Sequence, residues 1–217
     1  MKIITVILSF IAIFCFPSCK KTNPYENKIS QLREISLYYD CNDYAIFAYP
    51  EICEEPLKND GIVSNLEKRI SFKLQVKKQS KDFENCKIEF QIKDKIYKAN
   101  FEYSPLASFL YCKIAVDTLP TSELYLKFNF SNQSTGINLQ SQKNDNTLNY
   151  VKVLEHLKKT DDFTRNFLSS KNGELKVRFI DNDDYDYWYF GFVETAKITS
   201  YLIDGETGEV LAKKQEK

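Results

Sequence analysis

The sequence predicts a mainly β protein, in which an N-terminal antiparallel β-sandwich precedes a small α+β unit. Three observations support this fold class. Short apolar–polar alternations of strand length recur over 35–140, as expected for strands that bury one face and expose the other. The apolar spacing then lengthens over 148–168 to the three to six residues typical of one helical face. Four more strand-like segments follow, separated by turn residues.

Residues 1–18 are expected to form a signal peptide and not a part of the fold. Lys2 precedes an apolar run over 3–16. This run has the length of a signal-peptide core and is shorter than the about 20 residues that a membrane-spanning helix needs. Residues 19–28 are polar and contain one proline, so we expect a short tether there.

The end of the leader resembles the lipobox of bacterial lipoproteins. Phe16, Pro17 and Ser18 supply an apolar, a variable and a small residue directly before Cys19, although leucine is more usual than Phe16 and Pro17 is a less common occupant. The resemblance implies a diacylglyceryl group on Cys19, cleavage before this residue and an extracytoplasmic location on a bacterial membrane, inner or outer. Two acyl chains suffice for stable anchoring. The alternatives are an uncleaved anchor or an ordinary secretory signal.

The charge balance argues against nucleic acid as a partner. The chain has 30 Lys and Arg and 30 Asp and Glu, and loss of Lys2 with the leader would leave a net charge of −1. Among the basic residues only Arg33, Arg69, Arg165 and Arg178 are arginines. Guanidinium clamps for a phosphate or a carboxylate are therefore scarce in this sequence.

Four cysteines lie in the part that is expected to fold: Cys41, Cys53, Cys86 and Cys112. Outside the cytoplasm they permit two disulfides with three connectivities, of which Cys41–Cys53 with Cys86–Cys112 closes the shortest loops. No CxxC pair is present, which argues against a zinc site. The alternative is free, buried thiols that behave as small apolar side chains.

Residues 29–140 are assigned to the β-sandwich. The clearest strand is 70–76, where four apolar residues alternate with three polar ones. Lys93 and Asp94 are candidates for a two-residue hairpin turn. The expected strands of this unit are 35–39, 44–49, 70–76, 87–92, 95–103, 110–116, 123–130 and the weaker 136–140.

The polar stretch 141–147 is assigned to a linker and 148–217 to the second unit. Asp145 or Asn146 can cap the helix that is expected over 148–168. The strands expected after the helix have the sequences ELKVRFI, YDYWYFGFVE, ITSYLID and GEVLAKK.

The last hairpin, SYLIDGETGEVLAKK over 200–214, resembles the end of the PepSY family. The residues that match are Asp204, Thr207, Gly208, Glu209, Val210 and Leu211. The preceding helix and strands follow the family's order, so the resemblance covers about 147–217. It implies a PepSY-like α+β domain that inhibits or regulates a peptidase. The turn also has local reasons, because Gly205 and Gly208 can adopt positive φ and Asp204 can cap its amides.

The residues offer little for catalysis. The one histidine, His156, lies in the plain helical segment LEHLKK, where it is expected on the solvent face. A hydrolytic triad needs a nucleophile, a base and an orienting group, and no motif supplies them. We therefore expect a protein that is not an enzyme and uses no cofactor, and an envelope hydrolase is disfavoured.

The acidic run DNDDYDYW over 181–188 is the best, although weak, candidate for a metal site, with Asp181, Asp183, Asp184 and Asp186 as oxygen donors. A calcium loop of the EF-hand type needs Gly and Glu at the positions that hold Asp186 and Phe192. The preferred interpretation is a solvated hairpin tip without metal.

Aromatic residues suggest a binding patch at Tyr187, Trp188 and Tyr189. Their strand is apolar on both faces, so both faces need cover, and the expected helix covers one. The other meets the sandwich or a partner, and we expect Trp188 to be buried.

These features predict a lipid-anchored extracytoplasmic protein with a non-catalytic binding role at the cell envelope. Its partners would be the membrane, through the anchor, and an envelope protein. The alternative, implied by the PepSY resemblance, is an inhibitor or regulator of a secreted or envelope peptidase. The order of sandwich, helix and meander also looks like that of uncharacterised lipoproteins of Gram-positive bacteria.

Overall fold

The computed structural model describes residues 23–77, 85–105, 109–130, 133–182, 185–195 and 197–216. Strands dominate these residues, so the predicted mainly β class is confirmed. The elements are η1 (a 3-10 helix, Glu26–Lys28), β1 (Ile29–Arg33), β2 (Leu37–Asp40), β3 (Tyr44–Glu54), β4 (Leu66–Val76), β5 (Lys87–Ile92), β6 (Lys95–Asn100), β7 (Glu102–Ser104), β8 (Phe109–Ala115), β9 (Glu123–Phe130), β10 (Gln133–Ser141), α1 (Tyr150–Thr160), α2 (Asp162–Ser169), β11 (Glu174–Asn182), β12 (Tyr185–Glu194), β13 (Lys197–Asp204) and β14 (Val210–Glu216).

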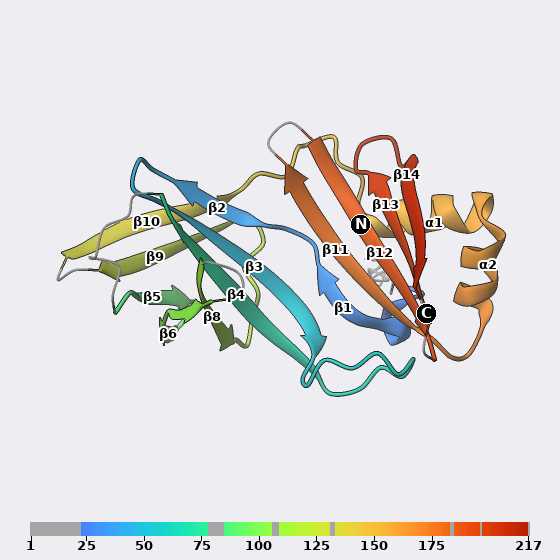
Figure 1. The fold of residues 1–217 in the computed structure, drawn as a ribbon, viewed down its shortest axis with the longest axis horizontal. Coiled ribbons are helices and arrows are strands. Elements are labelled where there is room, and N and C mark those ends of the chain that lie inside the picture. Colours follow the sequence, from blue (N-terminus) through green and yellow to red (C-terminus); the bar gives the residue numbers. More distant parts are fainter. Residues whose placement is uncertain are drawn as a thin grey trace, which may run out of the picture.

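The described strands are joined in one open mixed sheet (Figure 1). Its main path runs β14-β13-β12-β11-β1-β3-β2-β10-β9-β5-β6, while β4 pairs with β3 and β8, and β7 pairs with β8. Strand β1 is parallel to β11 and antiparallel to β3, so it bridges a first lobe, β2 to β10, and a second lobe, β11 to β14 with both helices. The separate sandwich and the PepSY-like unit stay predictions.

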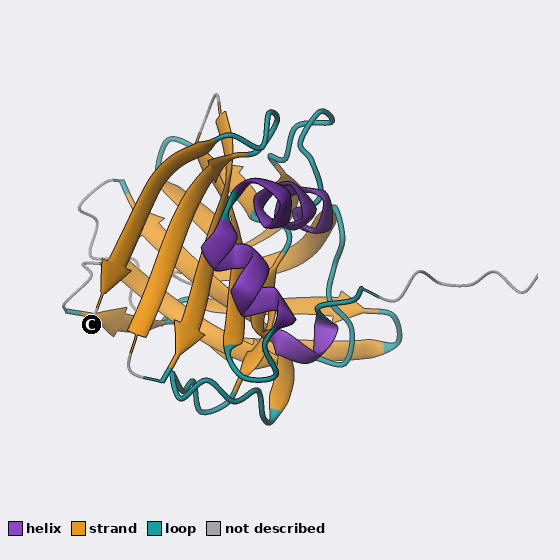
Figure 2. Cartoon of the chain, turned by 90° about the vertical axis from the view of Figure 1, so that its right-hand side faces the viewer, coloured by secondary structure: helices purple, strands orange, loops and turns teal. Residues whose placement is uncertain are grey.

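Two groups of buried apolar side chains stabilise the lobes. The first lies in the first lobe and includes Phe72, Leu126 and Phe128. The second includes Trp188 and Phe190 and packs against apolar residues of α1 and α2. Figure 2 shows both helices on the same side of strands β11 to β14. The other side of these strands is free of helices within the described part of the chain.

The segment before β1 packs against the second lobe. Tyr25 and Lys28 are buried, and the Tyr25 hydroxyl donates to Glu155 and accepts from Lys158, both on α1. The Tyr25 ring removes apolar surface from water and keeps partners for its hydroxyl. Residues 23–28, expected in the tether, therefore form part of the fold.

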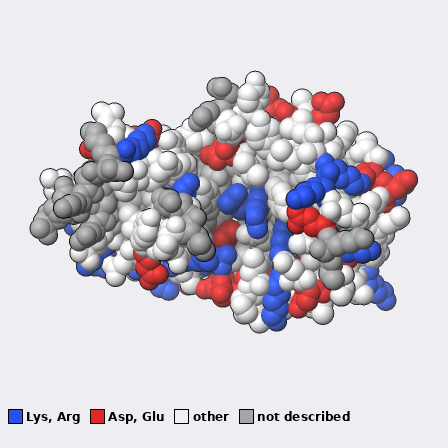
Figure 3. All heavy atoms as spheres, viewed as in Figure 1, with Lys and Arg blue, Asp and Glu red and all other residues white. Residues whose placement is uncertain are grey.

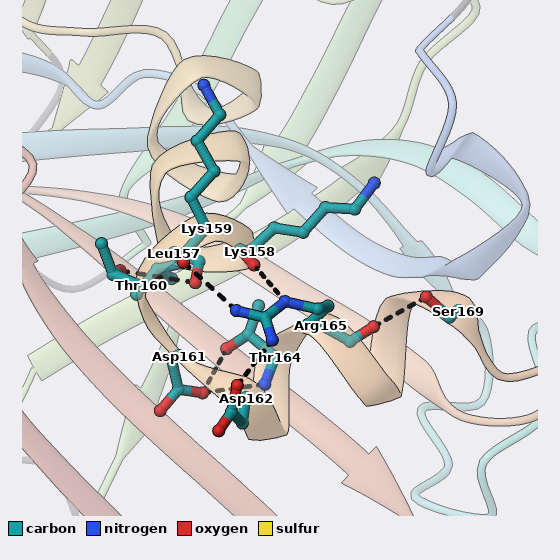
Figure 4. A network of polar contacts seen from close by, with 9 residues as sticks. All are labelled: Leu157, Lys158, Lys159, Thr160, Asp161, Asp162, Thr164, Arg165 and Ser169. Carbon is teal, nitrogen blue, oxygen red and sulfur yellow. Dashed lines mark hydrogen bonds and ion pairs between the residues drawn. The ribbon is translucent and has the colours of Figure 1, made fainter.

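Two helices replace the single helix that the sequence predicts over 148–168. Helix α1 ends at Thr160, α2 begins at Asp162, and Asp161 between them has extended backbone angles. The Asp161 carboxylate accepts hydrogen bonds of 2.8 Å from the backbone N–H and the hydroxyl of Thr164 (Figure 4). An aspartate gains more from capping a new helix than from continuing an old one, which explains the break.

Polar side chains also secure the ends of α1. Its N-cap is Asn149, which accepts from the backbone N–H of Lys152 at 2.9 Å, so the expected caps Asp145 and Asn146 are wrong. At the other end, the Arg165 guanidinium reaches back from α2 to the last carbonyl oxygens of α1 (Figure 4). Its positive charge there complements the helix dipole.

The cap residue Asp161 should make stability depend on pH. Burial alone would raise the pKa of Asp161, but hydrogen bonds from Thr164, Lys213 and Tyr201 outweigh burial and lower the pKa to about 2. The folded pKa is below the unfolded value of about 3.9. The carboxylate therefore stabilises the fold above about pH 4, and this contribution is lost as the pH falls from about 4 to about 2.

We expect Asp161→Asn to lower the free energy of unfolding by about 1–2 kcal/mol at pH 7, allowing for solvent screening, and to have little effect at pH 2. Urea unfolding followed by circular dichroism at both pH values measures this. The control is Asp162→Asn, because Asp162 is exposed and forms a surface ion pair. An equal loss for Asp161→Asn at both pH values would contradict the assignment.

The turn between β13 and β14 has the chemistry that the sequence predicts. The Asp204 side chain accepts from the backbone N–H of Thr207 at 2.7 Å, and Gly208 has a positive φ of 76°. Gly205 is needed for a different reason than expected, since a Cβ there would lie 2.7 Å from the carbonyl oxygen of Asp186. The turn is therefore packed onto the neighbouring strand β12.

Candidate functional site

The side of the sheet that faces away from the helices crosses both lobes. We call it the open face, formed by side chains that point to this side from β1, β3, β4, β8, β11 and β12. The strand registers place these residues on it: Gln31, Arg33, Phe47, Tyr49, Glu51, Arg69, Ser71, Lys73, Tyr111, Lys176, Arg178, Tyr187 and Tyr189. Figure 3 shows Lys and Arg side chains gathered in the depression between the two lobes.

A buried ion pair between β3 and β4 forms part of the open face. The Glu51 carboxylate accepts from Arg69 Nε at 2.9 Å, from Gln31 Nε2 at 2.6 Å and from the Ser71 hydroxyl at 3.3 Å. Glu51 and Arg69 are 5% and 8% exposed, so both charges have left water together. Their mutual pairing makes this part of the face electrically balanced.

Arg33 and Arg178 lie side by side at the centre of the open face. They are register partners on the parallel strands β1 and β11, whose backbones are about 4.8 Å apart. Arg33 Nε donates to the carbonyl oxygen of Phe179 at 3.1 Å, and Arg178 Nε donates to Gln31 Oε1 at 2.8 Å. Over the described ranges neither guanidinium forms an ion pair with a carboxylate.

Each of these guanidinium groups rests on a tyrosine ring. The guanidinium carbon of Arg33 is 4.7 Å from the ring centroid of Tyr49, and that of Arg178 is 5.5 Å from that of Tyr189. Burial lowers the pKa of Arg33, as does the charge of Arg178, whereas Tyr49, Glu51 and Asp181 raise the pKa. The centre of the open face therefore carries two like charges in a partly desolvated place.

Gly191 gives Tyr189 the room for its position. A Cβ at Gly191 would lie 2.9 Å from the Tyr189 hydroxyl and 3.2 Å from its ring, so the ring lies across the glycine. The Tyr189 hydroxyl is 3.0 Å from the Ser200 hydroxyl on β13, which holds the ring down. A glycine within a strand often marks such a close approach.

A hollow of about 320 Å³ adjoins the arginines on the first lobe. Tyr49, which supports Arg33, also lines this hollow, together with Lys73, Phe109 and Tyr111. The Lys73 ammonium lies 4.9 Å from the centroid of Phe109. The open face thus presents a row of cations and aromatic rings from β12 to β8.

The loop between β3 and β4 ties the two lobes together beside this face. Lys176 of β11 donates to the carbonyl oxygen of Lys58 at 3.2 Å and to the side chain of Asn59. The buried carboxylate of Glu174 accepts from the backbone N–H of Gly61 at 3.0 Å. These bonds cross from one lobe to the other and stabilise the arrangement of the two lobes.

The structure separates the predicted binding patch. Trp188 is fully buried beneath the helices, as expected for this residue, while Tyr187 and Tyr189 are half-buried on the open face. Alternation along β12 explains the division, because neighbouring side chains of a strand point to opposite faces. His156 is exposed on α1, where the sequence places it.

The acidic run serves the fold where it is described. Asp181 and Asp186 are register partners on β11 and β12, and the buried Asp186 accepts from the backbone N–H of Asn144 and the hydroxyl of Thr147. Asp183 and Asp184 lie outside the described residues, as does Cys19. Within the described part, no group of three or more His, Cys, Asp or Glu could hold a metal.

The structure joins none of the four cysteines Cys41, Cys53, Cys86 and Cys112 in a disulfide. Cys53, Cys86 and Cys112 are buried, whereas Cys41 is half-buried and near the carbonyl oxygen of Tyr44. Burial raises the pKa of Cys53 and Cys86 to about 11 and that of Cys112 to about 12. Burial therefore favours the protonated, weakly nucleophilic form of these three thiols at neutral pH.

No family model, curated protein or solved structure matches the chain. Among the described helices, none combines the length and the apolar character that crossing a membrane requires.

Sequence reasoning missed the central residues of the open face, Arg33, Arg178 and Tyr49. In the sequence Arg33 and Arg178 stand out only as two of four arginines, and Tyr49 is one of 14 tyrosines. Alternation places Gln31 and Arg33 on one face of their strand, but it does not show that β1 pairs with β11. The scarcity of arginine was the one available signal.

Proposed function

We propose that this protein is a lipid-anchored, non-catalytic binding protein of the cell envelope, and that its open face is the surface that binds a partner. The observation that carries the proposal is the composition of this face. It is free of helical cover across the described lobes and presents cations stacked on aromatic rings around a hollow. Aromatic residues and arginine are the side chains that dominate binding energy at interfaces.

The non-catalytic part of the proposal rests on how the polar groups are used. Glu51 is engaged by three donors, and His156 lies on α1, on the other side of the sheet. A general base must be within hydrogen-bond reach of its substrate proton, and His156 is not near the hollow.

The envelope location rests on the leader and its lipobox-like end at Cys19. The alternative function, regulation of a secreted or envelope peptidase, rests on the likeness of the β13–β14 hairpin to the PepSY ending. The Asp204 turn supports that likeness, because its capping bonds follow the matching residues. In either case the protein acts by binding.

Site-specific photo-crosslinking of the full chain, in the cells that produce it, tests this function. A benzoylphenylalanine at Tyr111 or Tyr187, both on the open face, should give a discrete adduct. The control positions are Tyr125 and Tyr103, which are exposed elsewhere at 67% and 61%. The variant Cys19→Ser should lose incorporated fatty acid and the adduct together, if the partner is at the membrane.

Equal adducts at the control positions, or none at the open face, would contradict the binding surface. Fatty acid on the Cys19→Ser chain would contradict the anchor. An adduct that contains a peptidase would favour the regulatory alternative over a general envelope partner.

A further inference from the structure

The two arginines at the centre of the open face form a site of their own. We propose that Arg33 and Arg178 together bind one oxyanion, a carboxylate or a phosphate, of a ligand whose ring-shaped or apolar body occupies the hollow beside Tyr49. This inference rests on the proposed binding role of the open face and names the chemistry that this face recognises.

Arg33 and Arg178 differ from the other two arginines, which pair with carboxylates. Arg69 pairs with Glu51 at 2.9 Å and with Glu55 at 2.6 Å, and Arg165 pairs with Asp162 at 2.6 Å. The two arginines of the site have no such carboxylate among the described residues, although the chain has as many acidic as basic side chains. The missing counter-charge is what a bound anion would supply.

Both guanidinium groups are already oriented by contacts within the protein. Each uses its Nε–H on a protein oxygen and lies on a tyrosine ring. The terminal N–H groups of Arg33 and Arg178 have no hydrogen-bond acceptor among the described residues. A planar fork of free donors that is held in place matches the geometry of carboxylate and phosphate oxygens.

Electrostatics also favours an anion beside these two arginines. Arg33 and Arg178 repel each other across neighbouring strands, and partial burial reduces screening by water. Glu51 is occupied by Arg69, and Asp181 is near but forms no ion pair with Arg33 in the described part. An oxyanion between the two guanidinium groups would turn this repulsion into attraction.

The hollow beside Tyr49 accommodates the rest of the ligand. Tyr49 lies between the site and the hollow, since its ring supports Arg33 and lines the cavity of about 320 Å³. Phe109 and Tyr111 add aromatic walls, and Lys73 lies over Phe109. This size is at the lower end of small-molecule sites, so it suits a ring or a short apolar group.

Nuclear magnetic resonance of the arginine Nε–H groups tests the site directly. The purified full chain in detergent micelles is titrated with acetate, benzoate and inorganic phosphate at constant ionic strength, with chloride as the balancing ion. The chain has only four arginines, so the signals of Arg69 and Arg165 serve as internal controls. We expect saturable shifts at Arg33 and Arg178 and none at the two controls.

Four variants refine the result. Arg33→Lys and Arg178→Lys each keep the charge but lose the fork, and should weaken binding about tenfold, whereas Arg165→Lys should not. Benzoate should bind about fivefold more tightly than acetate, and Tyr111→Ala should remove that difference. Tighter binding of phosphate than of benzoate would assign the site to a phosphoryl group, and the reverse order to a carboxylate.

The absence of saturable shifts at Arg33 and Arg178 would overturn the inference, as would equal shifts at all four arginines. The two proposals fail separately. Crosslinking at the open face without anion binding would leave the binding function and remove the anion site. Anion binding without an adduct would leave the site and remove the envelope partner.

Discussion

Trp188→Ala is expected to lower the free energy of unfolding by about 3–5 kcal/mol, the range for a large aromatic side chain in a core. Trp188 is 0% exposed, and its ring centroid is 5.5 Å from that of Phe179 and 6.1 Å from that of Tyr150. Its indole N–H donates to the carbonyl oxygen of Leu148 at 2.9 Å. The truncation would open a cavity between β12 and the helices and leave that oxygen without its donor.

Urea unfolding followed by circular dichroism measures this loss. Trp188→Phe is the matched variant, because it keeps most of the ring but removes the donor, and should cost about 1–2 kcal/mol. Tyr185→Ala on the same strand is the surface control, since Tyr185 is 60% exposed. The fluorescence of this sole tryptophan should be blue-shifted and weakly quenched by solutes. Strong quenching, or a loss below about 1 kcal/mol, would contradict burial.

Arg69→Met is expected to lower the free energy of unfolding by about 3–5 kcal/mol, because it leaves a buried carboxylate without its counter-charge. Glu51 would keep only the neutral donors Gln31 and Ser71. The second partner of Arg69, Glu55, has a side chain that is 54% exposed and therefore solvated. Glu55→Ala should cost less than about 1 kcal/mol, as for a surface ion pair.

The double variant Glu51→Leu with Arg69→Met separates pairing from burial. It removes both charges and should recover most of the stability that Arg69→Met loses, because an apolar pair has no desolvation penalty. A double-mutant cycle in urea measures the coupling. If the double variant were as unstable as the sum of the single variants, the ion pair would not be the reason for the loss.

Local patterns in the sequence were enough for several elements. The alternation over 44–49, 70–76 and 123–130 predicts strands, and these segments lie within β3, β4 and β9. Asp204 caps its turn as predicted, and Trp188 is buried as predicted. In each case the deciding interactions involve near neighbours in the chain or the side of one element that is apolar.

The helix and the tether show where local patterns were insufficient. The apolar spacing over 148–168 is the same whether one helix or two form, and Asp161 decides the outcome by binding Thr164, Tyr201 and Lys213. The polar composition of 19–28 does not indicate that Tyr25 packs against α1. Contacts with residues far along the chain outweighed composition in both cases.

The sequence by itself determined the mainly β class and the side of each strand on which a residue lies, and it predicts a leader over 1–18. Only the tertiary structure placed β1 between β11 and β3, and so brought Arg33, Arg178 and Tyr49 onto one face. The physical reason is that alternation is a property of a single strand, whereas the choice of its neighbours depends on packing over the whole chain. A binding site built across strands is therefore invisible until the strands are paired.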